Sequence, residues 1–327
     1  MSKSARRSTD GGGGRDRALT VLGAVISTAA LGAVVVWALH QEAPTLPHSP
    51  EHLAALGAAI GFYLAGCVIR AERWYELLRY NGARPRRIDA YGLVAVSNFG
   101  NNVLPARAGD ALRVLLLTPR AQTDPRTVIG TIVAERVLDV VVLVVLFVVL
   151  AYAVLGGLEA PMAGRLAYTA LLIAPAVAAA ALVLHRRGRL KRIVAFLKPM
   201  AEATRRLGGR RHGSELLAWT LLVWALEWVA WWFTARAVDL DLGVLEVGYL
   251  MSLAATFALV PSGPAYVGTF DAAVGFGARA LGYSGTQAVS YLLLLRFVTV
   301  VPITVIGLVV LLAGYGGIGR MRALVRA

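Results

Sequence analysis

Hydrophobic residues in this chain fall into long uninterrupted runs that are separated by short polar and charged segments. A helix needs about 20 consecutive apolar residues to cross a bilayer, so runs of this length predict transmembrane helices. We expect an all-α polytopic membrane protein. The pattern predicts six spanning helices, at residues 18–39, 53–80, 126–155, 165–184, 214–237 and 285–313.

Two further apolar regions, residues 98–113 and 257–271, are interrupted by proline and glycine. The first lies between two predicted spans, is too short to cross a bilayer and carries several charges. Non-helical charged backbone at membrane depth is tolerated where it is buried in protein or lines a water-filled cavity. Both regions are therefore predicted to be re-entrant hairpins, although an amphipathic loop on the membrane surface is the alternative for the first. The predicted helix breaks are Pro105, Gly109, Pro261, Gly263, Pro264 and Gly268.

The two hairpins indicate an internal repeat, because each is flanked by two long apolar helices. Arg136 follows Asp110 by 26 residues, and Arg296 follows Asp271 by 25. If the repeat is real, these residues are expected to form two equivalent ion pairs. With opposite orientations in the membrane, residues 52–155 and 214–313 form a predicted inverted-topology repeat. Such repeats are typical of transporters, whose substrate site lies near the bilayer midplane. Chance similarity between apolar helices is the alternative.

Composition and charge agree with a membrane protein. The chain is 57% hydrophobic and 16% charged, whereas soluble domains carry about 25% charged residues. The net charge of +14 indicates topology and anionic lipid headgroups rather than nucleic acid. Basic segments alternate with loops poor in Lys and Arg, which predicts a cell-membrane protein with both termini cytoplasmic. The predicted organisation is a disordered basic N-terminus (1–16), one transmembrane domain (17–314) with a basic amphipathic linker (185–213), and a basic tail (315–327).

Several ionisable residues fall inside the predicted membrane segments, where each costs at least about 2.5 kcal/mol on insertion scales. They are candidates for a transport site that binds a lipid headgroup. With one amide added, the candidates are Arg73, Asn102, Arg107, Asp110, Arg113, Glu135, Arg136, Asp139, Glu227, Asp271 and Arg296. A buried salt-bridge lattice is an equally weighted alternative for Arg73, Glu135, Asp139 and Glu227.

Ligand binding is favoured for Arg107, Arg113 and Arg296, because a guanidinium group matches phosphate geometry in a bidentate manner. The half-helices that follow Pro105 and Pro264 are also expected to direct N–H groups toward the midplane. Helix N-termini of this kind favour an anion.

The sequence offers little for catalysis. Cys67 is the single cysteine, so a disulfide framework is excluded. His48 and His52 have helical spacing, but no carboxylate pattern completes a metal site around them. The phosphate-binding pattern G-x-x-x-x-G-K is absent. We therefore expect no catalytic residue, no metal and no cofactor, and hence a protein that is not itself an enzyme.

A set of short motifs resembles one known family. These motifs are Arg73-Trp74, Asn102-x-x-Pro105-x-Arg107-x-Gly109-Asp110-x-x-Arg113, Glu135-Arg136-x-x-Asp139, Pro261-x-Gly263 with Gly268 and Asp271, and Arg296 with Pro302 and Gly307. Together they resemble the lysylphosphatidylglycerol synthase transmembrane (flippase-like) family over about residues 53–313. The family commonly has Glu where this chain has Asp110 and Asp271.

The resemblance implies movement of lipid across the bilayer. It does not imply lysyl transfer, because the chain ends at Ala327 without the aminoacyl-transferase domain of the full synthases. The expected substrate is a phosphate-bearing headgroup, on a phospholipid or a polyprenyl-phosphate-linked lipid. The alternatives are a membrane enzyme that modifies a lipid headgroup, with Asp110 or Asp271 as base, and an accessory partner of a glycosyltransferase. The candidate partners are anionic or phosphate-bearing membrane lipids, a lipid-modifying enzyme and a second copy of the chain.

Overall fold

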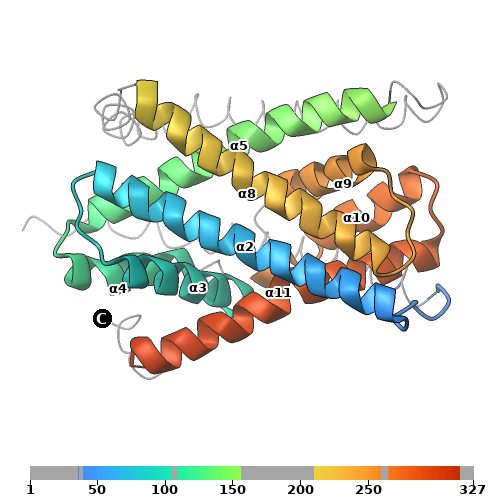
Figure 1. The fold of residues 1–327 in the computed structure, drawn as a ribbon, viewed down its shortest axis with the longest axis horizontal. Coiled ribbons are helices and arrows are strands. Elements are labelled where there is room, and N and C mark those ends of the chain that lie inside the picture. Colours follow the sequence, from blue (N-terminus) through green and yellow to red (C-terminus); the bar gives the residue numbers. More distant parts are fainter. Residues whose placement is uncertain (1–35, 37–39, 105–108, 156–209, 259–263, 317–327) are drawn as a thin grey trace, which may run out of the picture.

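The computed structural model describes residues 36, 40–104, 109–155, 210–258 and 264–316. Within these residues the fold is all-α, with eight α-helices, one short 3-10 helix and no strand (Figure 1). The elements are α2 (Pro50–Tyr80), α3 (Arg87–Val103), α4 (Gly109–Ala121), α5 (Pro125–Leu155), α8 (Arg210–Arg236), α9 (Val244–Phe257), η2 (Pro264–Tyr266), α10 (Thr269–Ala280) and α11 (Gly285–Gly314).

Four helices in the described part of the chain, α2, α5, α8 and α11, are long and apolar enough to cross a membrane. They confirm the spans predicted at residues 53–80, 126–155, 214–237 and 285–313. Their ends follow ordinary capping rules, since the Ser284 and Gln287 side chains cap the start of α11 reciprocally. The spans predicted at 18–39 and 165–184 fall outside the described residues, apart from residue 36. So do the predicted disordered N-terminus, most of the basic linker and nearly all of the tail.

The first interrupted region consists of two helices in close contact. Helix α3 ends at Val103, and α4 begins at Gly109. A Cβ atom on Gly109 would lie 2.0 Å from the carbonyl oxygen of Ser97, so this position requires glycine. The predicted break at Gly109 therefore marks the start of α4. Pro105 and Arg107 lie outside the described residues.

The second interrupted region is organised by left-handed backbone. Helix α9 ends at Phe257, and α10 begins at Thr269. Between them, Ala265 and Tyr266 have φ values of 52° and 59°, and Gly268 has φ of 96°. Left-handed residues cannot continue a helix, so the half-helix expected directly after Pro264 starts only after Gly268. Pro261 and Gly263 lie outside the described residues.

The packing of the helices is similar in the two halves of the described chain. Helix α2 packs along α8 through the middle of the molecule (Figure 1). Helix α3 packs against α4 and α11, while α9 packs against α10 and α5. One short helix of each half therefore lies against the last long helix of the other half of the chain, α3 against α11 and α9 against α5.

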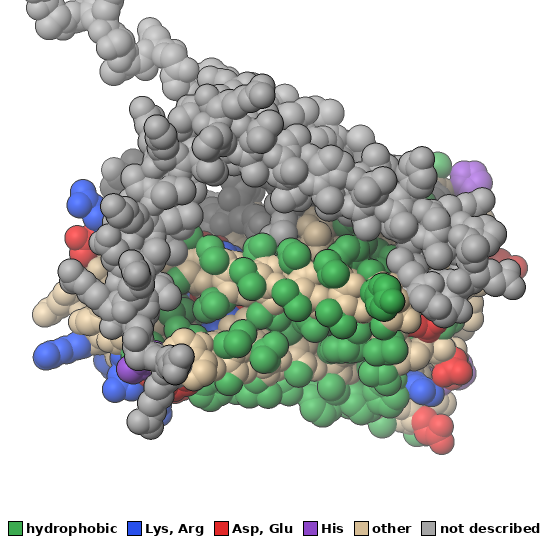
Figure 2. All heavy atoms as spheres, turned by 90° about the horizontal axis from the view of Figure 1, so that it is seen from above, with side chains coloured by type: hydrophobic (Ala, Val, Ile, Leu, Met, Phe, Trp, Pro, Cys, Tyr) green, Lys and Arg blue, Asp and Glu red, His purple; other side chains and the backbone are tan. Residues whose placement is uncertain are grey.

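The outer surface fits a bilayer. Large hydrophobic side chains are exposed on the long helices, for example Val141, Val145 and Val149 on α5 and Val305 and Val309 on α11. Figure 2 shows hydrophobic side chains over the middle of one face, with charged side chains gathered toward its two ends. Both observations are consistent with a membrane protein that has several apolar spans.

Candidate functional site

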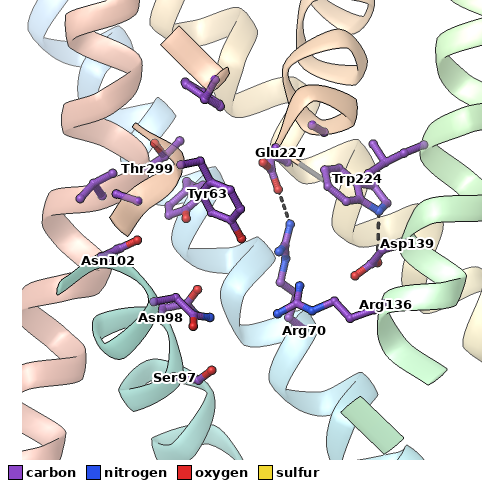
Figure 3. Close-up of a pocket in the computed structure, with 18 of the residues that line it drawn as sticks. Tyr63, Arg70, Ser97, Asn98, Asn102, Arg136, Asp139, Trp224, Glu227 and Thr299 are labelled. Carbon is purple, nitrogen blue, oxygen red and sulfur yellow. Dashed lines mark hydrogen bonds and ion pairs between the residues drawn. The ribbon is translucent and has the colours of Figure 1, made fainter. Parts of the chain in front are cut away.

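A cavity of about 580 Å³ lies at the centre of the molecule, where the interrupted elements meet the long helices. Its lining combines charged, amide, hydroxyl and aromatic side chains (Figure 3). The charged residues are Arg70, Asp110, Arg113, Glu135, Arg136, Asp139, Glu227 and Arg296. Hydroxyl and amide groups come from Tyr63, Ser97, Asn98, Asn101, Asn102, Tyr266 and Thr299. The volume is in the range of small-molecule sites.

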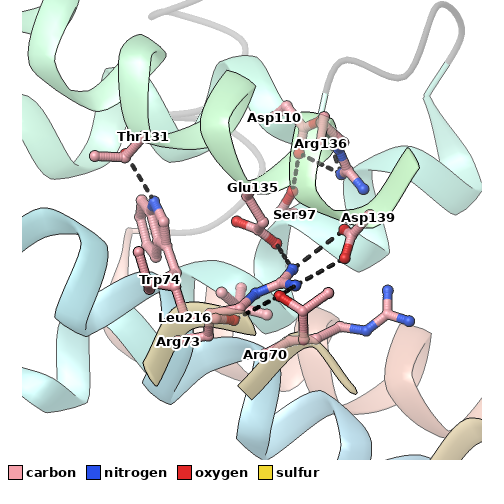
Figure 4. A network of polar contacts seen from close by, with 12 residues as sticks. Arg70, Arg73, Trp74, Ser97, Asp110, Thr131, Glu135, Arg136, Asp139 and Leu216 are labelled. Atoms are coloured by element: carbon pink, nitrogen blue, oxygen red, sulfur yellow. Dashed lines mark hydrogen bonds and ion pairs between the residues drawn. The ribbon is translucent and has the colours of Figure 1, made fainter. Parts of the chain in front are cut away.

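Arg73 is the centre of a buried ion-pair lattice beneath the cavity (Figure 4). Its Nη1 lies 2.7 Å from Asp139 Oδ1 and donates to Thr220 Oγ1 at 2.9 Å. Its Nη2 lies 3.1 Å from Asp139 Oδ2 and 3.2 Å from Glu135 Oε1. The Arg73 side chain is fully buried, so its charge is matched by protein carboxylates alone. These contacts fit the salt-bridge alternative for Arg73, Glu135 and Asp139.

Arg113 belongs to the same lattice, although the sequence favoured ligand binding for it. Its Nη2 donates to Glu135 Oε2 at 2.9 Å, and its guanidinium lies 3.9 Å from the centre of a Trp74 ring. The Trp74 indole in turn donates to Thr131 Oγ1 at 3.1 Å. The side chain is 3% exposed. A guanidinium held by a carboxylate and a ring in this way positions α4 against α5 and has little surface for a ligand.

Asp110 and Arg136 form the first of the two pairs expected from the repeat. Arg136 Nη2 lies 3.1 Å from Asp110 Oδ2 and 3.3 Å from Oδ1, and Ser97 donates to Oδ1 at 2.9 Å. The Arg136 and Asp110 side chains are 37% and 27% exposed. Among the described residues, Arg136 makes these hydrogen bonds through Nη2 alone. Arg136 also lines the cavity.

Asp271 and Arg296 form the second expected pair, with Arg296 Nε 2.6 Å from Asp271 Oδ1. The same guanidinium donates to the carbonyl oxygens of Ala265 and, at 3.3 Å, Tyr266. Asp271 also accepts from the backbone N–H of Gly268 at 2.8 Å. Arg296 thus holds the left-handed turn that precedes α10. Arg296 also lines the cavity, and ligand binding by this residue stays a prediction.

Arg70 was not among the predicted site residues. It forms an ion pair with Glu227 that joins α2 to α8, and its guanidinium lies 5.1 Å from the centre of a Trp224 ring. Arg70 Nη2 donates a hydrogen bond to Glu227 Oε2. Figure 3 shows the Arg70 and Arg136 side chains reaching into the same space. The available signal was the spacing of Arg70 and Arg73, which places both on one face of a helix.

Two amide side chains of α3 connect this helix to two different neighbours, α4 and α11. Asn101 accepts a hydrogen bond from the Gly109 N–H at 3.0 Å and so closes the contact between α3 and α4. Asn102 donates to Thr304 at 2.8 Å and ties the end of α3 to α11. Asn98 lines the cavity and was not predicted, nor was Tyr63. A run of amides before a helix break was the sequence signal that could have identified Asn98.

Among the described residues, the arginines and carboxylates in and around the cavity are equal in number. Five arginines (Arg70, Arg73, Arg113, Arg136 and Arg296) face five carboxylates (Asp110, Glu135, Asp139, Glu227 and Asp271). No group of three His, Cys, Asp or Glu residues in the described chain is placed to hold a metal ion. Asp110 and Arg136 form the most exposed of these ion pairs, with side chains 27% and 37% exposed, and both line the cavity together with Arg70.

Comparison with known proteins places this arrangement among membrane lipid proteins. The family model described as the lysylphosphatidylglycerol synthase TM region matches residues 20–307, which is most of the chain. A stretch of 108 residues is 32% identical to Glycosyltransferase AglD of Haloferax volcanii, covering 32% of this chain and 17% of that protein.

Proposed function

Because this chain belongs to the family of the lysylphosphatidylglycerol synthase TM region, we propose that it is a lipid flippase. The substrate is a phospholipid or polyprenyl-phosphate-linked lipid whose headgroup carries a phosphate. The headgroup binds in the central cavity, while the acyl or prenyl chains stay in the surrounding bilayer. The protein is itself non-catalytic in this proposal.

The observation that carries the proposal is that the guanidinium groups of Arg136 and Arg70 both line the central cavity. Arg136 and Arg70 each bind a carboxylate through one nitrogen among the described residues. A phosphate group can accept from the remaining nitrogens of both, since guanidinium groups bind phosphate through two parallel N–H bonds. The hydroxyl and amide groups of Ser97, Asn98 and Thr299 supply neutral polar partners around it.

Alternating access follows from the two similar halves. We infer that α2–α5 and α8–α11 are inverted-topology repeats and that the two interrupted elements are re-entrant hairpins. Support comes from the matched pairs Asp110–Arg136 and Asp271–Arg296 and from the matched packing of α3 on α11 and α9 on α5. Rocking of one hairpin against the other would open the cavity to each side of the membrane in turn.

A second candidate function is that of an accessory subunit for an enzyme that modifies a lipid headgroup. The similarity to Glycosyltransferase AglD over 108 residues favours it. The two proposals differ in what the purified chain does alone. A flippase moves lipid in vesicles without any sugar donor or partner, whereas an accessory subunit requires the transferase.

Replacement of Arg136 by glutamine is expected to lower lipid movement about tenfold or more, the equivalent of one charge-assisted hydrogen bond to the headgroup. Stability should change little, because Asp110 keeps Ser97 and lies partly exposed. The measurement is dithionite bleaching of fluorescent phosphatidylglycerol in proteoliposomes. Arg126→Gln is the matched control, since Arg126 is exposed and does not line the cavity. Unchanged movement in Arg136→Gln, or equal loss in the control, would argue against a headgroup site at Arg136.

Both termini are expected to lie in the cytoplasm, because the basic segments are predicted to face it. Cysteines at Ser2 and Thr45, in a Cys67→Ala background, test this with a membrane-impermeant thiol reagent on intact cells. The cysteine at exposed Thr45 should react and the cysteine at Ser2 should be protected. Labelling at Ser2 without labelling at Thr45 would reverse the topology.

A further inference from the structure

A second hollow lies on the other side of α3 from the central cavity. It is a groove of about 580 Å³ between α2, α3 and α11. Val94 of α3 lines both spaces, so a single helix separates them. The walls of the groove are apolar, formed by Leu64, Cys67 and Val68 from α2 and by Ile303, Ile306 and Val310 from α11. A space of this kind in a membrane protein suits a hydrocarbon chain.

The mouth of the groove is polar and charged, unlike its apolar walls, because it is formed by Arg86, Asp89 and Tyr315. Asp89 lies between two arginines, 4.0 Å from Arg86 Nε and 3.7 Å from Arg120 Nε. Arg120 in turn lies 4.4 Å from the centre of the Tyr315 ring. The Arg86 side chain is 80% exposed. One carboxylate thus faces two guanidinium groups, which leaves a positive charge at the mouth.

Two further arginines lie within two residues of Arg86 in the chain. Arg87 is 63% exposed and pairs with Glu72 at 3.0 Å, and Arg84 is exposed in the turn between α2 and α3. Apolar walls that end in a cluster of arginines match the two parts of an anionic phospholipid. Clustered arginines at the membrane surface attract such lipids. A zwitterionic lipid offers the same chains without the net negative charge.

We propose that this groove binds an anionic phospholipid, with one acyl chain between α2, α3 and α11 and the headgroup at Arg86 and Arg120. The lipid is a resident ligand and not the transported substrate, so the inference goes beyond the flippase proposal. Because the groove and the central cavity share α3, an acyl chain here supports the interrupted element from its outer side. Occupancy therefore couples the lipid composition of the membrane to the position of α3.

The test uses photoactivatable phosphatidylglycerol with a diazirine at the end of one acyl chain, added to the purified full-length protein in phosphatidylcholine nanodiscs. After irradiation, the labelled peptides are mapped by mass spectrometry. Cross-links are expected at residues 64–71 and 303–313, with competition by unlabelled phosphatidylglycerol but not by added phosphatidylcholine. The substitution Arg86→Gln should reduce labelling about fivefold, which is the binding contribution expected of one arginine near an anionic lipid. Arg126→Gln, at an exposed arginine that does not line the groove, should leave labelling unchanged.

A groove-filling variant provides an independent arm that does not change charge. Ala313 is exposed and lines the groove, so Ala313→Phe should block cross-linking. Its neighbour Leu312 is 54% exposed and lies outside the lining, so Leu312→Phe is the matched control. Three outcomes would overturn the proposal. They are labelling of the exposed α5 residues Val141, Val145 and Val149 that equals the labelling of the groove, competition by phosphatidylcholine that equals that by phosphatidylglycerol, and unchanged labelling in Ala313→Phe. Arg136→Gln should leave groove labelling intact, which separates this site from the proposed flippase site.

Discussion

Arg73→Met is expected to destabilise the protein by about 3–5 kcal/mol, the usual cost of leaving buried charge without its partner. Arg73 is fully buried and lies against Asp139 and Glu135 at 2.7 and 3.2 Å. Methionine preserves the apolar stem but removes the charge, so two buried carboxylates lose a shared cation. Asp139 keeps a hydrogen bond from Trp224 at 3.3 Å, which cannot replace the guanidinium.

Thermal unfolding of detergent-solubilised protein measures this effect. Arg79→Met on the same helix is the control, since Arg79 is 53% exposed and pairs with Glu76 one turn earlier. Exposed pairs contribute about 0–1 kcal/mol. The combined variant Arg73→Met/Asp139→Leu should be more stable than Arg73→Met, because removal of both partners avoids a buried unpaired charge. Equal stability of Arg73→Met and the control would contradict the lattice as a structural element.

Arg296→Gln is also expected to cost about 3–5 kcal/mol, and only part of this should return in the double variant with Asp271→Asn. Arg296 lies 2.6 Å from Asp271 and also donates to the carbonyl oxygens of Ala265 and Tyr266. Removal of the aspartate charge restores electrical balance, but the two carbonyl groups still lack their donor. A coupling energy of about 1–3 kcal/mol should emerge from the cycle.

The cycle for Asp110 and Arg136 should give a smaller coupling, because these side chains are 27% and 37% exposed and water screens them. Arg236 and Asp241, at 3.6 Å and mostly exposed, form the control pair, with a coupling expected below about 0.5 kcal/mol. Additive losses within about 0.5 kcal/mol for Asp271 and Arg296 would show that their contact contributes nothing to stability.

The features predicted most successfully from the sequence are those set by local chemistry. Apolar length identified α2, α5, α8 and α11, because a span must satisfy its backbone within a helix. The similar spacing of an acid and an arginine, 26 and 25 residues, identified the contacts between α4 and α5 and between α10 and α11. These contacts join neighbouring helices across one turn, so the sequence constrains them strongly.

Features that depend on elements far apart in the sequence were not predicted. The pair Arg70–Glu227 joins residues 157 positions apart on α2 and α8, and no local pattern links them. The engagement of Arg113 depends on Trp74, which a different helix places beneath its guanidinium. The role of Arg296 follows from left-handed backbone at Ala265 and Tyr266. Non-glycine residues rarely adopt that conformation, so composition gave no reason to expect a turn there that needs a donor.

The arginines and carboxylates around the cavity are fixed to the protein, which has an electrical consequence for the proposed flippase. An anionic headgroup that crosses carries its own negative charge through the membrane field, because the arginines that bind it do not cross with it. Each elementary charge that crosses gains or loses about 2.3 kcal/mol per 100 mV. Under the flippase proposal, we expect translocation of phosphatidylglycerol to be electrogenic, with the potential across the bilayer biasing its direction. A zwitterionic lipid, which carries no net charge, would cross with no such bias.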